Sequence, residues 1–231
     1  MQNNLKAAIL AALLLAPTVS FAQEAAAEEE SNFSGNAGIV TDYVFRGISQ
    51  TNGDIAMQGG LDYAFGDSGF YVGAWGSNVD FNEFQGPEFE IDAYVGYAAD
   101  LGEKFNIDLM LTRYSYIGTG DDYGSIDYNE MIAKFAMTDI ATLTVGYTND
   151  YVNSGEDATY VSLGNSWDLG NDYSLNASFG RSYFTDGDFN DWNVGISKTI
   201  GPVEFGLNYY DTNLEGPRAS DAVVFSFKLG G

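Results

Sequence analysis

The sequence predicts an all-β protein, a transmembrane up-and-down antiparallel β-barrel of about 12 strands, and three observations lead to this fold class. Successive segments alternate apolar and polar residues, as strands with one apolar face do. Most segments run about ten to twelve residues, close to the ~9–11 residues that a tilted strand needs to cross a membrane. Long and short connections alternate between them, as in barrels with long external loops and short periplasmic turns.

The first 22 residues have the features of a secretory signal peptide. Lys6 precedes an apolar run over residues 7–16, and Ser20 and Ala22 place small residues at the usual cleavage spacing. The run is shorter than the roughly 20 apolar residues of a membrane helix. We therefore expect residues 1–22 to be removed on export, residues 23–32 to form an acidic periplasmic tail, and residues 33–231 to form an outer-membrane β-barrel.

The alternation is clearest where Ile91 and Val95 oppose Glu90 and Asp92 on one segment. Two segments, 70–81 and 126–137, have no clear apolar face, so their register stays open. The strands are predicted over residues 35–47, 54–65, 70–81, 88–99, 104–116, 126–137, 141–152, 158–168, 173–184, 191–199, 203–212 and 221–229.

The connections separate into two sets. Gly66, Gly102, Gly170 and Gly201 suit the short turns, which need positive φ. A soluble sandwich of Greek keys has no reason to place long connections at every second position. The long connections are 48–53, 82–87, 117–125, 153–157, 185–190 and 213–220, and the short ones are 66–69, 100–103, 138–140, 169–172 and 200–202.

Composition excludes several classes of protein. The chain has 33 acidic and 9 basic residues, a net charge of −24, which makes nucleic acid an unsuitable partner. The absence of cysteine excludes a disulfide-stapled domain, and the absence of histidine excludes Ser–His, Cys–His and histidine-based metal sites. We therefore expect no enzyme, no cofactor and no metal site. A carboxylate pair for glycoside hydrolysis is the remaining catalytic alternative.

If the apolar stripes face lipid, the opposite stripes line the lumen. Acids outnumber bases on those stripes, and buried charges require water or a partner. A barrel of about 12 strands lies between filled and open sizes, so its size allows a narrow channel or a filled lumen. The candidate lumen-lining residues are Asp42, Arg46, Gln58, Asp62, Glu90, Asp92, Asn106, Asp108, Glu204 and Asn208, with Asn176, Asn193 and Lys228 on the same stripes.

Three motifs, TDYVFRGISQT (41–51), GGLDYAF (59–65) and GFYVGAWGSNVDF (69–81), resemble the opening of the TorF-type porins, also called the Gcw_chp family. The resemblance runs from about Phe33 to the C-terminus. It implies a Gram-negative outer-membrane porin without catalytic residues. Such barrels usually end on an aromatic residue that the barrel assembly machinery recognises, whereas this chain ends Phe227-Lys228-Leu229-Gly230-Gly231.

Two functions fit this pattern. The first is passive diffusion of small solutes with a weak preference for cations or neutral molecules, because the lumen is acidic. The second is a non-conducting structural or surface-interaction barrel with a plugged lumen, for which Arg46 and Asp42 are the candidate ion pair. An autotransporter-like translocator is a weaker third class, because only residues 23–32 separate the predicted cleavage site from the first strand.

The outer face predicts the remaining partners. Arg113 and Arg181 extend outward stripes toward the external end and are candidate contacts to lipid phosphate, which suits the guanidinium fork; the alternative is an aqueous rim. The expected partners are outer-membrane lipid and lipopolysaccharide, directly or through divalent cations, the barrel assembly machinery, and small solutes. Aromatic girdles are predicted from Tyr43, Phe45, Trp75, Phe81, Tyr97, Tyr147, Trp167, Tyr173, Trp192 and Tyr209.

Overall fold

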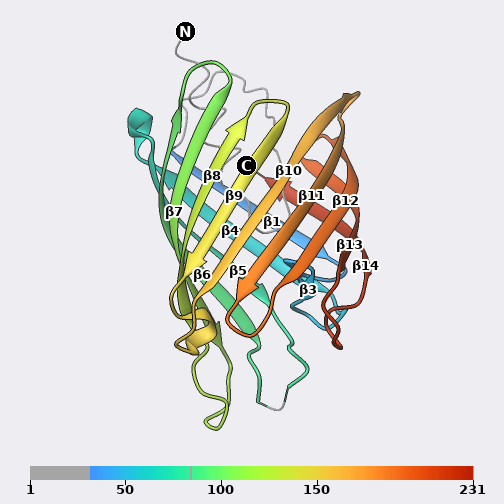
Figure 1. Ribbon diagram of the computed structural model, residues 1–231. Helices are drawn as coiled ribbons and strands as arrows, with labels where there is room; N and C mark the ends of the chain where they lie inside the picture. The colour runs from blue at the N-terminus through green and yellow to red at the C-terminus, as the bar shows by residue number, and fades with distance from the viewer. Residues whose placement is uncertain (1–31, 84, 231) are drawn as a thin grey trace.

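The computed structural model describes residues 32–83 and 85–230, and these form a closed antiparallel β-barrel (Figure 1). In this part of the chain twelve strands build the wall, and β1 closes it by pairing with β14. Closure leaves no strand edge unpaired, and the predicted fold class is confirmed. The wall strands are β1 (Phe33–Val40), β4 (Ala56–Ala64), β5 (Phe70–Asn78), β6 (Phe89–Asp100), β7 (Phe105–Ile117), β8 (Tyr128–Met137), β9 (Ala141–Thr148), β10 (Ala158–Gly170), β11 (Tyr173–Phe184), β12 (Phe189–Ile200), β13 (Val203–Thr212) and β14 (Ala222–Gly230).

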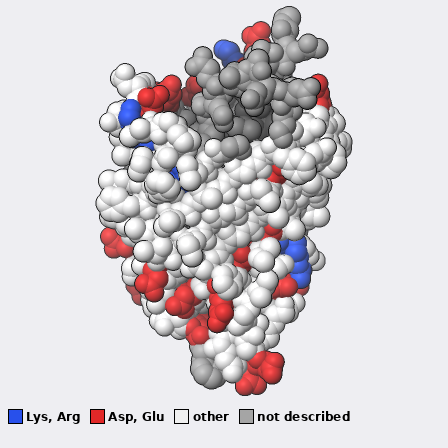
Figure 2. Space-filling view, turned by 180° about the vertical axis from the view of Figure 1, so that it is seen from behind, with Lys and Arg blue, Asp and Glu red and all other residues white. Residues whose placement is uncertain are grey.

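The wall strands expose apolar side chains and bury polar ones. On β6, Ile91 and Val95 are 45% and 47% exposed, whereas Glu90 is 3% exposed. A soluble protein would show the reverse order, because apolar surface is stabilised by leaving water. The apolar face is therefore the outside of the barrel, and the polar face lines the lumen. Figure 2 shows uncharged side chains across the middle of the visible surface, with acids gathered toward the lower end.

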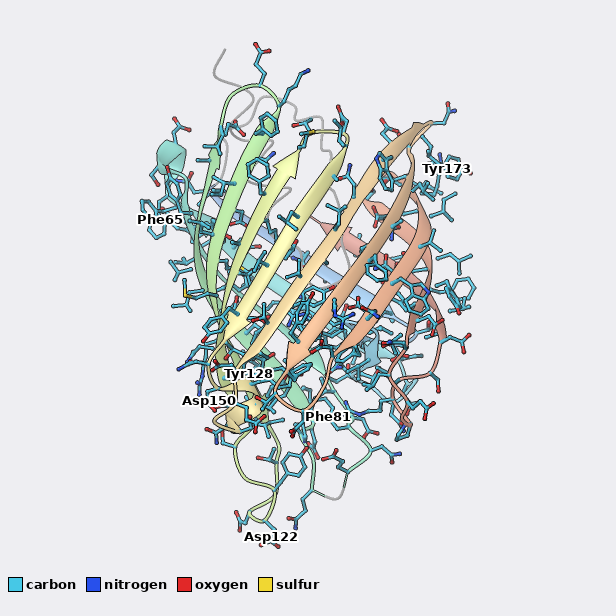
Figure 3. All side chains as sticks on the ribbon, in the orientation of Figure 1. Phe65, Phe81, Asp122, Tyr128, Asp150 and Tyr173 are labelled. Atoms are coloured by element: carbon cyan, nitrogen blue, oxygen red, sulfur yellow. The ribbon has the colours of Figure 1, made fainter. Side chains whose placement is uncertain are left out.

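The connections give the barrel two different ends. The turn end, at the top of Figure 1, carries residues 65–69, 101–104, 138–140, 171–172 and 201–202, with η1 (Gly66–Ser68) in the first of these. The loop end carries residues 41–55, 79–88, 118–127, 149–157, 185–188 and 213–221, with η2 (Tyr151–Asn153) in the fourth. Figure 3 places Phe65 and Tyr173 at the turn end, and Phe81, Asp122 and Tyr128 at the loop end.

The predicted turn glycines adopt the expected backbone conformation. Gly66, Gly102, Gly170 and Gly201 have φ of 56°, 97°, 80° and 60°. These values lie in the left-handed region, which glycine enters without steric penalty. Among the described residues, no helix has the length and hydropathy of a membrane span.

The first wall strand is shorter than predicted. The prediction extended it over 35–47, but β1 ends at Val40, directly opposite Ala56. The chain between them forms a separate pair, β2 (Val44–Phe45) and β3 (Ile48–Ser49), whose turn residues Arg46 and Gly47 have φ of 49° and 77°. Two successive left-handed residues are the signature of a tight hairpin turn. Residues 41–55 are called the inner hairpin below.

Apolar and aromatic side chains on the inner face explain why the register of two strands could not be predicted. β5 buries Tyr71 inside the barrel and exposes Phe70 and Val72 outside, and β8 buries Tyr128 and Ile132. Both faces of these strands therefore carry apolar or aromatic residues, which hides the alternation.

The predicted girdles need a related correction. Tyr43 is 3% exposed, and Phe45 and Trp75 pack against the same buried cluster inside the barrel. Tyr97, Tyr147 and Tyr173, in contrast, are 38%, 43% and 43% exposed. Aromatic residues near strand ends thus serve both faces of the wall, and their position along a strand does not distinguish the two uses. The predicted signal peptide, residues 1–22, lies outside the described residues, as does the predicted tail except for Asn32.

Candidate functional site

The lumen is the candidate site because the inner face of the wall carries most of the buried charge. In the described part of the chain its acids are Asp62, Glu90, Asp92, Asp108, Glu130, Asp191 and Glu204, each at most 8% exposed. The bases that reach this space are Arg46, Lys134 and Lys228. Because buried carboxylates are costly unless paired or hydrated, the partners of these acids define the site.

The structure divides the predicted lumen residues into two groups. Asp42 and Arg46 belong to the inner hairpin rather than to a wall strand. The other predicted residues share the inward-facing stripes of wall strands, and their role in solute passage stays a prediction. They are Gln58 and Asp62 on β4, Glu90 and Asp92 on β6, Asn106 and Asp108 on β7, Asn176 on β11, Asn193 on β12, Glu204 and Asn208 on β13, and Lys228 on β14.

Tyrosine hydroxyls are the main hydrogen-bond donors to these acids, and the sequence analysis missed them. Each lies on an inward stripe, next to acids of neighbouring strands, and this pairing across strands is the signal that would identify them. Such donors satisfy a carboxylate without neutralising it. The hydroxyl-to-carboxylate pairs are Tyr71–Asp108 (2.6 Å), Tyr94–Asp62 (2.5 Å), Tyr114–Glu130 (3.1 Å), Tyr116–Glu90 (3.3 Å) and Tyr160–Asp191 (3.2 Å).

Two lysines compensate acids of the same wall. Lys134 Nζ lies 3.7 Å from Asp108 Oδ2 across the β7–β8 ladder. Lys228 is directly opposite Glu204 in the β13–β14 register. Opposite charges on facing positions of one sheet face stabilise each other.

The inner hairpin crosses the loop end of the lumen and contacts opposite sides of the wall. Tyr43 packs edge-on against Trp75 of β5, with ring centroids 5.5 Å apart. On the other side, a Cβ at Gly47 would lie 2.8 Å from the Asp191 Cβ and 2.9 Å from the Thr212 Cβ. Only glycine permits so close an approach. The hairpin thus spans the lumen between β5 and the β12–β13 pair.

Arg46 makes a bidentate contact with the wall. Its Nη1 and Nη2 atoms donate to the two carboxylate oxygens of Glu130, each at 2.9 Å. The guanidinium carbon lies 4.2 Å from the centre of the Tyr160 ring and 4.7 Å from that of Phe45. A paired carboxylate and aromatic faces are the surroundings that a guanidinium favours.

The predicted ion pair between Arg46 and Asp42 is therefore wrong. Asp42 Oδ1 accepts hydrogen bonds from the Ser49 hydroxyl at 2.6 Å and the Thr51 hydroxyl at 3.0 Å. The prediction assumed one continuous strand, in which residues four apart share a face. Because the chain turns at Arg46 and Gly47, the two side chains point to different partners.

Apolar packing and a neighbouring loop hold the inner hairpin in place. Arg218 donates to the Ser49 carbonyl at 3.2 Å, and the Ser49 amide donates to the Arg218 carbonyl at 2.8 Å. The guanidinium of Arg218 also lies 4.3 Å from the Phe81 ring centre. The buried cluster beneath consists of Val40, Tyr43, Val44, Ala56, Val79 and Val224.

The loops of the same end contact one another. Tyr123 in 118–127 donates to Glu83 in 79–88 at 2.6 Å, and Asn153 donates to the Ser125 carbonyl at 3.0 Å. Burial and the neighbouring Glu83 carboxylate raise the pKa of Tyr123 to about 12. Its hydroxyl therefore stays protonated and able to donate at neutral pH.

The inner face of β10–β14 has a different character. The amide of Asn176 donates to Asn208 Oδ1 at 2.8 Å and to Asn193 Oδ1 at 3.3 Å. Small polar residues surround a cavity of about 20 Å³, the size of a single water site. Its lining is Ser166, Ser174, Asn176, Ser197, Glu204, Gly206, Asn208, Tyr210, Ser226 and Lys228.

Several inner carboxylate oxygens have no hydrogen-bond partner within the described residues. Glu90 Oε2 and Asp92 Oδ1 are two of them, and both side chains lie on the inward stripe of β6. Asp92 is opposite Tyr114, the residue that donates to Glu130. Asp92 therefore lies near the Arg46–Glu130 pair, and Glu90 is the next residue on the same inward stripe. In the described part of the chain, no group of three or more acidic residues is arranged to hold a metal ion.

The two predicted lipid contacts lie on the outer face. Arg113 on β7 and Arg181 on β11 have side chains 46% and 42% exposed. Each has an acidic neighbour, with Arg113 Nη2 3.1 Å from Asp127 Oδ2 and Arg181 Nη2 2.9 Å from Asp188 Oδ2. Contact with lipid phosphate stays a prediction.

Comparison with known proteins gives a family and a fold. A family model described as a bacterial protein of unknown function, Gcw_chp, matches residues 24–227. The other predicted family name, TorF, stays a prediction. No curated protein matches the sequence.

Solved porin structures share the fold at low sequence identity. A KdgM porin in complex with disordered oligogalacturonate superposes with a TM-score of 0.53 at 9% identity, covering 86% of this chain and 95% of that chain. A NanC porin gives 0.51 at 10% identity, with 86% and 97% covered. A second KdgM porin structure gives 0.50 at 10% identity, with 85% and 96% covered. The likeness therefore extends over nearly the whole of those barrels.

Proposed function

We propose that this chain, which belongs to the Gcw_chp family, is a porin-like outer-membrane barrel that passes small solutes and favours cations and neutral molecules over anions. The observation that carries the proposal is the charge of the inner wall. Among the described residues, seven buried acids face three bases in that space. Walls of low dielectric concentrate the field of such charges inside a narrow passage.

Within the described residues, four of these seven acids form no ion pair with a base: Asp62, Glu90, Asp92 and Asp191. Tyrosine hydroxyls donate to Asp62, Glu90 and Asp191 without contributing positive charge. Rings of carboxylates favour cations in channels, whereas arginine or lysine rings favour anions. The lining therefore supports passage of cations and neutral molecules.

The acidic wall argues against a polyanionic solute. One structure with the same fold holds oligogalacturonate, an oligomer of sugar acids. An acidic oligosaccharide in this lumen would lie against carboxylates of like charge. We therefore extend the fold of that porin to this chain, but not its ligand.

A plugged, non-conducting barrel is the second candidate. The inner hairpin favours it, because its contacts run from Trp75 on β5 to Thr212 on β13. A plug of this kind would make the protein a structural or surface-interaction barrel. The conductance of the purified barrel separates the two functions.

Reversal potentials in planar bilayers test the proposal. In a KCl gradient we expect the wild-type barrel to conduct and to pass K⁺ more readily than Cl⁻. Asp62→Asn with Asp92→Asn should lower this preference severalfold, because two lumen charges are lost. Asp67→Asn with Asp121→Asn is the matched control, since both acids are exposed outside the lumen. No conductance, or a clear anion preference, would contradict the proposal.

The remaining parts of the proposal concern location and partners. We infer export by the signal peptide, a non-enzymatic role, and contact with outer-membrane lipid and lipopolysaccharide, directly or through divalent cations, after insertion by the barrel assembly machinery. The exposed apolar bands of the wall support a lipid environment. A purified mature chain that folds as a monomer in detergent-free buffer would overturn this part.

A further inference from the structure

The guanidinium of Arg46 lies in a site that the wall builds without the hairpin. Glu130 on β8 supplies both carboxylate oxygens, and its side chain is 1% exposed. Tyr114 on β7 donates to Glu130 Oε2 at 3.1 Å, which fixes the carboxylate. Tyr160 on β10 presents its ring face 4.2 Å from the guanidinium carbon. Three wall strands thus form one cation site, and a separate segment fills it.

The wall leaves room for a planar cation at this point. A Cβ at Gly146 on β9 would lie 2.8 Å from Glu130 Oε1 and 3.1 Å from Arg46 Nη2. Any larger side chain would therefore push against the ion pair. At this point β9 contributes only the backbone of Gly146, and the guanidinium of Arg46 occupies the space that a side chain would fill.

The occupant is held by a strained turn. Arg46 has φ of 49°, in the left-handed region that non-glycine residues rarely adopt, and it is followed by Gly47 with φ of 77°. Residues in such conformations persist where other contacts over-determine them, and they collect at switches and ligand clamps. The β2–β3 pairing sets this turn, so the Arg46 side chain is presented to the wall by the hairpin itself.

Asp92 lies opposite Tyr114 of the site, Glu90 is the next residue on its stripe, and both carboxylates have an unsatisfied oxygen. Glu90 and Asp92 are 3% and 8% exposed, and Glu90 Oε2 and Asp92 Oδ1 have no hydrogen-bond partner within the described residues. Arg46 supplies one positive charge to Glu130, whereas no ion pair within the described residues joins a base to Glu90 or Asp92. A diffusing cation is therefore attracted to the place where Arg46 is bound.

We propose that the wall site of Glu130, Tyr114 and Tyr160 binds guanidinium-bearing solutes, and that Arg46 is an internal occupant which such a solute displaces. The inference rests on the proposed function, because a passing solute reaches this site only through the lumen. The carboxylate fork and the ring face would serve an external guanidinium as they serve Arg46. Displacement would free the inner hairpin and couple solute binding to opening.

Binding to the full chain in detergent tests the site directly. Titration calorimetry with methylguanidinium should show at least roughly tenfold tighter binding to Arg46→Ala than to the wild type, because the competing occupant is gone. Arg46→Ala with Glu130→Gln should lose this binding. Tetramethylammonium, a cation without hydrogen-bond donors, should bind Arg46→Ala at least roughly tenfold more weakly than methylguanidinium.

A matched control removes a different paired cation. Lys198 at the turn end lies 3.6 Å from Asp172 and 4.3 Å from the Tyr173 ring centre, so it combines a carboxylate and a ring outside the lumen. Lys198→Ala should bind methylguanidinium as the wild type does. Arg46→Lys keeps the charge but loses the fork, and it should bind severalfold more tightly than the wild type. If Arg46→Ala does not fold, the binding of methylguanidinium to Arg46→Lys tests the site instead.

The outcomes separate the site from the proposed function. Equal binding by Arg46→Ala and the double variant, equal binding of the two cations, or no gain in Arg46→Lys would overturn the site. Tight binding to Arg46→Ala with no conductance in any variant would keep the site and overturn the proposed diffusion. Conductance without methylguanidinium binding would overturn the site and keep the proposed diffusion.

Discussion

The two sides of the lumen solve the same problem, a polar interior in a membrane protein, in different ways. The tyrosine arc, the inner face of β5–β8, pairs Tyr71, Tyr94, Tyr114 and Tyr116 with buried acids. The small-residue arc, the inner face of β10–β14, carries serine, asparagine and glycine around a small cavity. Both arcs consist of antiparallel strands of the same barrel, so the difference between them arises from their side chains.

The difference assigns separate tasks to the arcs. Large rings whose hydroxyl groups are hydrogen-bonded to carboxylates cannot move without breaking several contacts, so the tyrosine arc holds its carboxylates at fixed positions. Serine hydroxyls and asparagine amides rotate, donate and accept, and carry no charge. The tyrosine arc carries Glu90, Asp92, Asp108 and Glu130, whereas the small-residue arc carries Asp191 and Glu204 among its uncharged groups. A solute therefore meets more charge on one side and more adaptable groups on the other. The inner hairpin touches both arcs at the loop end.

Removal of the inner hairpin is expected to give the largest effect, because its contacts bridge the two arcs across the lumen. Val40 and Ala56 already face each other in the ladder, so a short turn can replace residues 41–55 without a change of register. We expect bilayer conductance to rise severalfold. Unchanged conductance in a folded barrel would show that the hairpin does not narrow the lumen.

A reversible cross-link provides the opposite experiment. The chain has no cysteine, and a Cβ at Gly47 would approach the Thr212 Cβ to 2.9 Å. Disulfides join Cβ atoms about 3.8 Å apart, so the hairpin must move by about 1 Å to accept Gly47→Cys with Thr212→Cys, which also relieves the 2.8 Å approach to the Asp191 Cβ. We expect the pair to oxidise after this movement. Oxidation should lower conductance and reductant should restore it. The two single variants, which form no intramolecular bond, are the controls.

A pair of glycine substitutions is expected to give the next largest effect and to sharpen the contrast between the arcs. A Cβ at Gly96 would lie 2.2 Å from Tyr71 Cζ, whereas the nearest atom to a Cβ at Gly206 would be the rotatable Ser226 hydroxyl oxygen, at 2.3 Å, and the next lies at 3.5 Å. Gly96→Ala must displace the Tyr71 ring and break its hydrogen bond to Asp108, so we expect the free energy of unfolding to fall by about 1–3 kcal/mol. For Gly206→Ala the free energy of unfolding should fall by less than about 1 kcal/mol.

Urea unfolding of both variants in detergent measures the difference. Gly76→Ala is a control on an outward position, where a Cβ would come no closer than 3.2 Å to the Glu90 carbonyl oxygen. Equal losses in Gly96→Ala and Gly206→Ala would show that the small-residue arc is as tightly packed as the tyrosine arc.

The sequence predicted the wall well because the wall is a local pattern. Alternation, strand length and turn glycines such as Gly102 and Gly201 depend on neighbouring residues only, and these predictions are confirmed. The inner hairpin depends on contacts far along the chain. Arg46 meets Glu130 and Gly47 meets Thr212, and no local pattern in TDYVFRGISQT distinguishes a strand facing lipid from a hairpin facing a lumen.

The same limit explains the tyrosines. Tyrosine is amphipathic, so an alternating stripe that contains Tyr71 or Tyr114 fits either a lipid interface or a polar lumen. Its inward orientation is decided by an acid on another strand, Asp108 for Tyr71 and Glu130 for Tyr114. Charge identified five acids of the inner wall but missed Glu130 and Asp191, and it identified none of the tyrosine donors. Candidate lumen residues are therefore better sought as tyrosine–acid pairs than as charges.

The outer face gives the smallest effect and tests whether the arcs differ only inside. Arg113 lies behind the tyrosine arc and Arg181 behind the small-residue arc, and both are exposed and paired with an acid. Arg113→Gln and Arg181→Gln should each change the unfolding free energy by less than about 1 kcal/mol, the usual range for exposed ion pairs.

If both arginines contact lipid phosphate, each variant should lose a similar part of the stabilisation that added lipopolysaccharide gives the wild type. Lys198→Gln, at the turn end, should keep that stabilisation in full. An unchanged response in both arginine variants would place them in the aqueous rim, and a loss in only one would extend the asymmetry of the lumen to the outer surface.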